Sequence, residues 1–255
     1  MKRISRGPGT SRPALLGAVV LLALTSASVA AADDGPGPLG VTAETVATRQ
    51  SVRVGALFAA DRPGGHFCTA SVVDSPHGDL IVTAAHCVAG AESDLVFVPG
   101  YRDGRAPDGV WRVTRRFLPD GWARDQDEDS DLAFAAVADR DGERLEDVAG
   151  ANRFATGVAT GATAVTVTGY PDSRETPITC TNKPTPHGRT QQRIDCPEFT
   201  GGTSGSPWVN GDQQIVGILG GHEQGGTTAD TSYSVVLGGR AAELYREATG
   251  GPGAD

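Results

Sequence analysis

The sequence predicts an all-β protein, built as a sandwich or a pair of barrels, with one helix at its C-terminus. The 255 residues include 35 glycines and 16 prolines, together about 20% of the chain against roughly 12% in average proteins. Short runs rich in β-branched residues recur along the chain without alternating helices, which is typical of sandwiches and barrels. The glycines show no three-residue period, so the composition is not that of collagen.

The predicted strands are short β-branched or alternating runs bounded by turn residues. In the first half of the chain they comprise residues 51–58, 70–74, 79–84, 94–98, 110–117 and 131–137. In the second half they comprise residues 162–168, 193–195, 207–210, 214–219 and 232–236. The tail from Arg240 to Ala248 has the strongest helical pattern, and Gly250 closes it.

The first 32 residues have the order of a secretory signal peptide. Four basic residues precede an apolar run over residues 14–24, and small residues follow before Asp33. The run is too short to span a bilayer, and a membrane anchor is the less favoured alternative. We therefore expect a secreted, extracellular protein, cleaved before Asp33 or before Ala31.

The composition after the predicted cleavage is strongly acidic. Without its first 32 residues the chain carries 18 basic and 31 acidic side chains, a formal charge of −13. Such a protein is repelled by nucleic acid and by anionic lipid, so we expect neither as a partner.

Four cysteines follow the predicted signal peptide, namely Cys68, Cys87, Cys180 and Cys196. In an oxidising compartment an even number indicates disulfides, although the sequence alone allows three pairings. The sequence separations favour two local bridges. Zinc is the alternative, but no C-x-x-C or H-x-x-x-H pair is present, and His86 adjoins Cys87, which is poor chelate spacing.

Three stretches carry candidate catalytic residues. They are TAAHC around His86, DLAF beginning at Asp131, and GGTSGSP around Ser204. A serine hydroxyl is a weak nucleophile until an imidazole accepts its proton, and a carboxylate must fix the imidazole tautomer. Glycines around the serine let backbone N–H groups point at one spot, as an oxyanion hole requires.

These motifs resemble those of the chymotrypsin-like (trypsin-fold) serine proteases, in that family's order and approximate spacing. The stretch around Cys68 resembles the strand whose cysteine pairs with the cysteine after the catalytic histidine. The resemblance runs from about residue 52 to residue 248. The form GxSGSP is similar to the bacterial secreted branch that includes glutamyl endopeptidases.

The resemblance implies two packed six-stranded antiparallel β-barrels with the catalytic site between them and a C-terminal helix. The expected divisions are a signal peptide (1–32), a leader or short propeptide (33–50), an N-terminal barrel (51–138), an inter-barrel linker (139–150), a C-terminal barrel (151–239) and a helix (240–250).

The resemblance also implies roles for individual residues. Ser204 would be the nucleophile, His86 the general base and then acid, and Asp131 the orienting carboxylate. The backbone N–H groups of Gly202 and Ser204 would form the oxyanion hole. The reaction would be peptide-bond hydrolysis through an acyl-enzyme, carried out by a monomer on a protein or peptide substrate, with no cofactor and no metal. The implied disulfides are Cys68–Cys87 and Cys180–Cys196.

The residue before the nucleophile departs from the pattern of animal trypsins. There an aspartate pairs with the N-terminus that activation releases, whereas Thr203 occupies that position here. We therefore do not expect activation by that ion pair. Arg49 or Arg53 is a hypothetical processing point, which sequencing of the mature N-terminus would test.

The candidate substrate pocket consists of Glu198, Gly220, Gly221 and His222. Glu198 falls where trypsins carry the carboxylate that attracts a basic side chain of the substrate. The alternative is that Glu198 faces solvent and has no role in the pocket. Glutamyl endopeptidases have a histidine at the position of Leu219 and a threonine at that of Phe199, so cleavage after glutamate is not expected, although His222 lies nearby. The hydroxyl that supports the catalytic aspartate in animal enzymes would align with Gly220 and is missing.

Several alternatives compete with these assignments. Ser206 is the rival nucleophile, but the family pattern favours a role in shaping the turn. Asp125, Asp127 and Asp129 alternate as in a calcium loop, yet a solvated surface loop fits better because Ser130 replaces the expected glycine.

Other functions fit the sequence less well. A catalytically inactive trypsin-fold binding module is the main alternative, although all three catalytic residues are kept. An α/β-hydrolase would need G-x-S-x-G and the order Ser, Asp, His. A carbohydrate-binding sandwich is disfavoured by the aromatic content of 5%.

Overall fold

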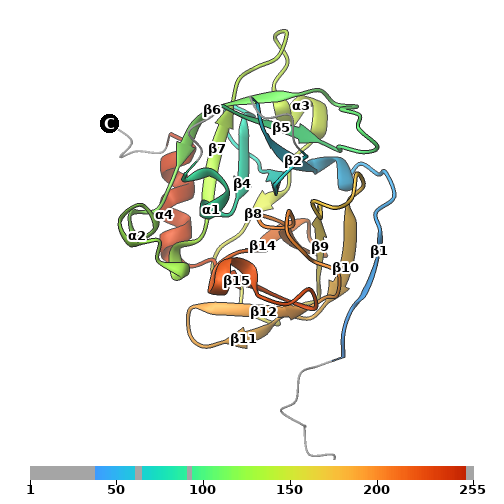
Figure 1. Ribbon diagram of the computed structural model, residues 1–255. Coiled ribbons are helices and arrows are strands. Elements are labelled where there is room, and N and C mark those ends of the chain that lie inside the picture. The colour runs from blue at the N-terminus through green and yellow to red at the C-terminus, as the bar shows by residue number, and fades with distance from the viewer. Residues whose placement is uncertain (1–37, 61–64, 91–93, 251–255) are drawn as a thin grey trace, which may run out of the picture. The chain divides into compact units, whose positions relative to one another are not determined.

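The computed structural model describes residues 38–60, 65–90 and 94–250 (Figure 1). It is mostly β with few helices and ends in a helix, so the predicted all-β class with a C-terminal helix is confirmed. The predicted signal peptide lies outside the described residues. Within the described ranges no helix is both long enough and apolar enough to cross a membrane.

The N-terminal half is a closed antiparallel barrel of six strands. Their order around the barrel is β2 (Val54–Ala59), β3 (Cys68–Val72), β4 (Leu80–Thr83), β7 (Ala133–Val137), β6 (Trp111–Phe117) and β5 (Leu95–Pro99). Residues from all six strands fill the interior, with Leu57, Ile81, Phe97 and Trp111 completely buried. The β-branched and aromatic residues that predict these strands therefore form the barrel core.

The C-terminal half surrounds its core with two separate hydrogen-bonded sheets. The larger has the order β1 (Val41–Glu44), β10 (Ile178–Asn182), β9 (Val165–Gly169), β13 (Pro207–Asn210), β14 (Gln214–Ile218) and β8 (Arg153–Phe154). The smaller has the order β11 (Thr185–His187), β12 (Gln191–Asp195) and β15 (Thr231–Val235). Ile194 of the smaller sheet and Trp208 of the larger lie in one apolar cluster, so the two sheets enclose a common core.

Strand β1 lies in the range expected for a leader or propeptide. It pairs antiparallel with β10, and the N–H of Gly40, just before β1, donates to the carbonyl of Asp195 (2.8 Å). This part of the leader is thus the edge strand of the larger sheet. Processing at Arg49 or Arg53 stays a prediction.

Short helices and 3-10 turns connect the strands. They are the 3-10 turn η1 (Ser51–Arg53), α1 (Ala85–Val88), α2 (Asp120–Asp125), the 3-10 turn η2 (Glu128–Ser130), α3 (Leu145–Ala149) within the predicted linker, and the 3-10 segment η3 (His222–Gly225).

The C-terminal helix α4 (Gly239–Ala248) packs on the N-terminal half, beside β6 and β7 (Figure 1). Ala241 and Leu244 share an apolar cluster with Phe134 of β7. The Tyr245 hydroxyl donates to the carbonyl of Asp74 (2.5 Å). Helix α4, which follows the last strand of the C-terminal half, is therefore packed against the N-terminal half.

Candidate active site

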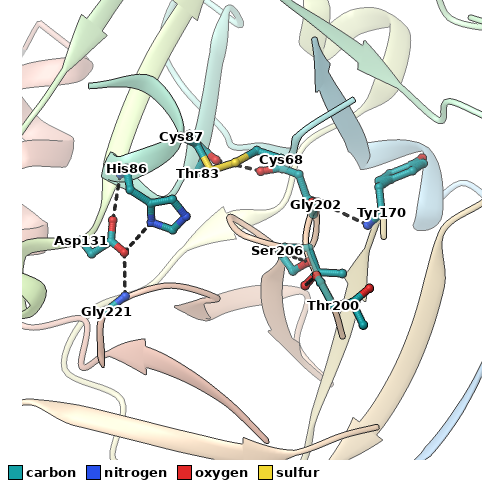
Figure 2. The surroundings of a disulfide bond; sticks show 12 residues. Cys68, Thr83, His86, Cys87, Asp131, Tyr170, Thr200, Gly202, Ser206 and Gly221 are labelled. Atoms are coloured by element: carbon teal, nitrogen blue, oxygen red, sulfur yellow. Dashed lines mark hydrogen bonds and ion pairs between the residues drawn. A yellow bond between two sulfur atoms is a disulfide. The ribbon is translucent and has the colours of Figure 1, made fainter. Parts of the chain in front are cut away.

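His86 lies in the short helix α1, which follows strand β4 of the N-terminal barrel. A disulfide between Cys87 and Cys68 joins α1 to β3, with a Cα–Cα distance of 6.1 Å (Figure 2). The imidazole is largely covered, with 14% of its side chain exposed. The backbone position of the histidine is therefore fixed covalently to the barrel wall.

Asp131 is completely buried between η2 and β7, and its carboxylate accepts three hydrogen bonds. Its Oδ1 accepts from the backbone N–H of His86 (3.0 Å), and its Oδ2 lies 2.8 Å from His86 Nδ1 (Figure 2). The backbone N–H of Gly221 donates to the same Oδ2 (2.8 Å). The buried carboxylate is thus satisfied by two groups of the histidine and one from the other half of the chain.

This arrangement selects one tautomer of the imidazole. An ionised carboxylate has only acceptor oxygens, so the ring proton lies on Nδ1 of His86 and is donated to Asp131. Nε2 then carries the free lone pair and is able to accept a proton from a hydroxyl.

In animal enzymes a hydroxyl at the position of Gly220 supports the catalytic aspartate; here a backbone N–H supports Asp131 instead. Gly220 lies so close to the carboxylate that a Cβ there would stand 2.8 Å from Asp131 Oδ2 and 3.1 Å from Ala84 Cβ. The chain passes near enough for the next N–H, that of Gly221, to donate directly. The aspartate is therefore supported without a side chain.

Ser204 lies in a tight turn that its neighbours close with their own polar groups. The N–H and hydroxyl of Thr203 both donate to the carbonyl of Thr200 (3.1 and 2.7 Å). The N–H and hydroxyl of Ser206 both donate to the carbonyl of Thr203 (3.0 and 2.6 Å). Thr203 therefore acts within the turn, and no aspartate is needed at that position to hold it.

Gly205 brings this turn against the N-terminal barrel. Its φ is +85°, and a Cβ would stand 2.0 Å from the carbonyl oxygen of Thr69, which leaves room only for glycine. The carbonyl of Ser204 accepts from the N–H of Thr69 (2.7 Å). Thr69 follows Cys68, whose disulfide partner Cys87 follows His86. The turn of residues 200–206, called the serine turn below, and the histidine are therefore both attached to the start of β3.

Three backbone N–H groups of the turn, those of Gly201, Gly202 and Ser204, have no partner in the described ranges, and the last two are the predicted oxyanion donors. The carbonyl of Gly202 is bound by the Thr69 hydroxyl (3.0 Å). Unpaired N–H groups next to a serine are what an oxyanion hole provides.

No hydrogen bond of the Ser204 hydroxyl occurs within the described part of the chain. The bond between His86 and Asp131 is formed, whereas a bond between His86 and Ser204 is not. Such a nucleophile–base contact is commonly long without substrate and tightens in the reacting complex.

The structure places the residues predicted for the substrate pocket in different surroundings. Gly220 and Gly221 lie against Asp131, as described above. Glu198 is exposed and forms an ion pair with Arg174, so the carboxylate that would attract a basic substrate is already neutralised. Phe199 is buried in the core of the C-terminal half.

His222 is grouped with two other rings at the edge of the C-terminal half. Its ring centroid lies 4.8 Å from those of His187 and Tyr233, and its Nδ1 lies 3.4 Å from Glu128 Oε2. The N–H of Glu223 donates to the same carboxylate (2.9 Å). These contacts link η3 to η2 through Glu128, which lies three residues before Asp131.

The aspartates considered for calcium serve the turn around η2. The Asp127 carboxylate accepts from the N–H of Asp129 and the hydroxyl of Ser130, and the Asp129 carboxylate accepts from the Gln191 side chain (2.8 Å). In the described ranges, three possible metal ligands come together only at Cys68, His86 and Cys87, where both sulfurs form the disulfide.

The structure also contains the second implied disulfide, Cys180–Cys196, with a Cα–Cα distance of 6.0 Å. The sequence places Gly221 in the substrate pocket but does not predict that its N–H donates to Asp131, and it does not predict a role for Thr69. Neither residue lies in one of the three catalytic motifs, and only the position of Thr69 directly after Cys68 is a signal for it.

Comparison with known families and structures agrees with this geometry. The trypsin-like peptidase domain matches residues 68–218, which is more than half of the chain. Two crystal structures of bacterial or microbial enzymes are similar at 26% identity. Protease Anisep from Arthrobacter nicotinovorans has a TM-score of 0.72 over 82% of this chain and 100% of its own. The thermostable serine protease AL20 from an extremophilic microorganism has a TM-score of 0.70 over 80% and 99%.

A Glu endopeptidase structure is similar in fold, with a TM-score of 0.68 at 19% identity over 84% of this chain and 98% of its own. A search of curated proteins found no match. On the match to residues 68–218, the chain belongs to the trypsin-like peptidase domain family.

Proposed function

We propose that this protein is a secreted serine endopeptidase in which Ser204, His86 and Asp131 form the catalytic triad. The observation that carries the proposal is the buried Asp131 carboxylate, which binds both N–H groups of His86. The two disulfides support an oxidising, extracellular location, since such bonds persist there.

Acylation begins with attack of Ser204 Oγ on the carbonyl carbon of the scissile peptide bond. His86 Nε2 accepts the hydroxyl proton as the C–O bond forms, and Asp131 stabilises the resulting imidazolium. The negative charge on the former carbonyl oxygen is stabilised by the N–H groups of Gly202 and Ser204. His86 then gives its proton to the amine as the C–N bond breaks.

Deacylation repeats these steps with water. His86 removes a proton from the water, whose oxygen attacks the acyl carbon of the Ser204 ester. The second tetrahedral intermediate collapses, the acid product leaves, and the proton returns from His86 to Ser204 Oγ. Every proton is thus carried by the imidazole, and no cofactor or metal enters the reaction.

Hydrolysis of a fluorescein-labelled protein substrate tests the proposal. We expect Ser204→Ala and His86→Ala each to lower the turnover number by at least about 10⁴-fold, as loss of a triad member does in serine proteases. Ser206→Ala is the matched control, because its hydroxyl only closes the turn onto Thr203. We expect it to keep turnover within about 10-fold of the wild-type value.

Absence of hydrolysis by folded wild-type protein would contradict the proposal, and the inactive binding module would then be favoured. Retention of activity in Ser204→Ala together with its loss in Ser206→Ala would assign the nucleophile to Ser206 instead.

A further inference from the structure

Thr69 lies where the wall of the N-terminal barrel meets the serine turn. It belongs to β3, follows the disulfide residue Cys68, and is completely buried. All its polar groups are engaged: the N–H donates to the Ser204 carbonyl (2.7 Å), and its own carbonyl accepts from the Thr83 hydroxyl (2.7 Å). Its side chain connects two further peptide groups, from Gly202 and Tyr170.

The direction of the Thr69 hydroxyl proton follows from these contacts. The N–H of Tyr170 donates to Oγ1 (2.9 Å), which uses one lone pair of the hydroxyl oxygen. The single hydroxyl proton is then donated to the Gly202 carbonyl (3.0 Å). Because the threonine is buried, no water replaces either contact, and loss of the hydroxyl would leave two backbone groups unpaired.

The bound carbonyl belongs to the peptide that joins Gly202 to Thr203. Gly202 has φ of +88°, and a Cβ there would stand 2.5 Å from the Tyr170 carbonyl oxygen, so the chain is confined on that side too. Rotation of this peptide would break the contact with Thr69 and change the direction of the adjoining N–H groups. These are the groups that the proposed oxyanion hole uses.

Thr69 is also the connection between this turn and the half of the chain that holds His86. Within the described ranges, Thr69 supplies both hydrogen bonds between the N-terminal barrel and residues 200–206. The other bonds of the turn run within it or to the C-terminal half, as from Gly205 to the Leu219 carbonyl (2.7 Å).

We propose that Thr69 is a positioning residue, whose hydroxyl and N–H hold the oxyanion donors at Gly202 and Ser204 in register with His86. This inference rests on the proposed function and deepens it. Thr69 touches no reacting atom, so its effect acts on the chemical step and not on substrate affinity.

The time course of labelling by a fluorophosphonate, followed by intact mass at several probe concentrations, separates these two effects. Thr69→Val removes the hydroxyl and keeps the side-chain shape. We expect it to lower the maximum rate of labelling about 10- to 100-fold, which reaches at most the lower end of the loss caused by removing one oxyanion donor. The probe concentration at half-maximal rate should change less than about 3-fold, and Thr69→Ser should restore the rate to within about 3-fold.

Ser71→Ala is the matched control for a general loss of stability. Ser71 is buried two residues further along β3, and its hydroxyl accepts from the Asn152 side chain (3.0 Å). No hydrogen bond of the described residues joins Ser71 to the serine turn. We expect a lower melting temperature but the wild-type rate of labelling. A wild-type rate in Thr69→Val, or a reduction equal to that in Ser71→Ala, would overturn the proposal.

Hydrogen exchange of the peptides that cover residues 198–206 gives a readout that does not depend on activity. We expect faster exchange in Thr69→Val than in the wild type, and no change in Ser71→Ala. If wild-type Ser204 is not labelled at all, the proposed function fails, and this exchange measurement alone decides on Thr69. Unchanged exchange in Thr69→Val would then overturn the inference.

Discussion

Asp131 is held by three N–H groups, and two of them are backbone groups. One comes from His86 itself, and the other comes from Gly221, 90 residues further along the chain. A backbone N–H is present whatever the side chain. The requirement at position 220 is therefore a residue without a Cβ, so that the next peptide can approach Asp131. Gly220 meets this requirement, because the peptide approaches the carboxylate too closely for a Cβ.

Gly220→Ala therefore should damage the site. The added methyl would meet Asp131 Oδ2 at 2.8 Å, displacing the carboxylate from His86. We expect kcat/KM for a peptide substrate to fall about 100-fold, the effect of misplacing a catalytic group by about 1 Å.

Gly211→Ala is the control for this change, since a Cβ at that exposed turn meets no atom within 4 Å. It should leave kcat/KM unchanged. A folded Gly220→Ala protein with wild-type kcat/KM would show that the contact with Asp131 does not matter.

At this scale the sequence predicts residues whose chemistry is carried by a side chain within a motif. His86, Asp131 and Ser204 stand in such motifs, and the structure brings the first two into contact. Thr69 and Gly221 are not predictable in this way, because their partners lie 133 and 90 residues away and no local pattern marks a backbone donor.

Among the elements, strands that carry core residues agree best with the prediction. Residues 207–210 coincide with β13, and 214–219 differ from β14 by one residue. Four strands, β1, β8, β10 and β11, are not predicted from the sequence. The residues of β1 and β11 are mostly exposed and polar or include proline, so their hydrogen-bonded partners determine them. Strand β10 is the exception among the core strands, because Ile178 and Cys180 are buried.

Helix α4 provides a test of how the elements are held together. Leu244 is buried against β6 and β7 in a cluster that also contains Ile218 of the C-terminal half. Leu244→Ala should lower the free energy of unfolding by about 2–4 kcal/mol, as in other buried leucine truncations, measured by urea titration.

Glu243→Ala, on the exposed face of the same helix, is the comparison. It should change the free energy of unfolding by less than about 0.5 kcal/mol. Equal effects of the two substitutions would mean that α4 is not docked as described.

For the whole molecule, the two halves share both a core and a candidate site. Phe134 of the N-terminal barrel and Ile215 of the C-terminal half lie in one apolar cluster. The all-β class and the C-terminal helix are predictable from turn residues and β-branched runs. The separation of the second half into two sheets is not, because it depends on which strands pair, and sequence periodicity does not encode this.

Stability should fall at high pH because three tyrosines resist ionisation. Burial raises the pKa of Tyr170, burial and Glu175 raise that of Tyr101 to about 12, and burial with Asp74 raises that of Tyr245. Tyrosines in the unfolded chain ionise at about pH 10. Above that pH the folded state binds more protons, so the free energy of unfolding decreases as pH rises, while below it the contribution is complete.

Urea titrations at about pH 9 and about pH 11 compare the wild type with Tyr170→Phe. The completely buried Tyr170 alone accounts for a loss of up to about 1.4 kcal/mol per pH unit above pH 10. Tyr170→Phe, which loses only a long hydrogen bond to the Val54 carbonyl (3.4 Å), should lose less stability over the same range. An identical pH dependence of the two proteins would contradict the role given to Tyr170.

The central claim is that the three motifs assemble one nucleophilic centre. Incubation of the processed protein with a fluorophosphonate, followed by peptide mapping of the adduct, tests it most directly. We predict one adduct per chain on Ser204, abolished in His86→Ala. Labelling that is absent in folded protein, or that persists in His86→Ala, would contradict an assembled triad.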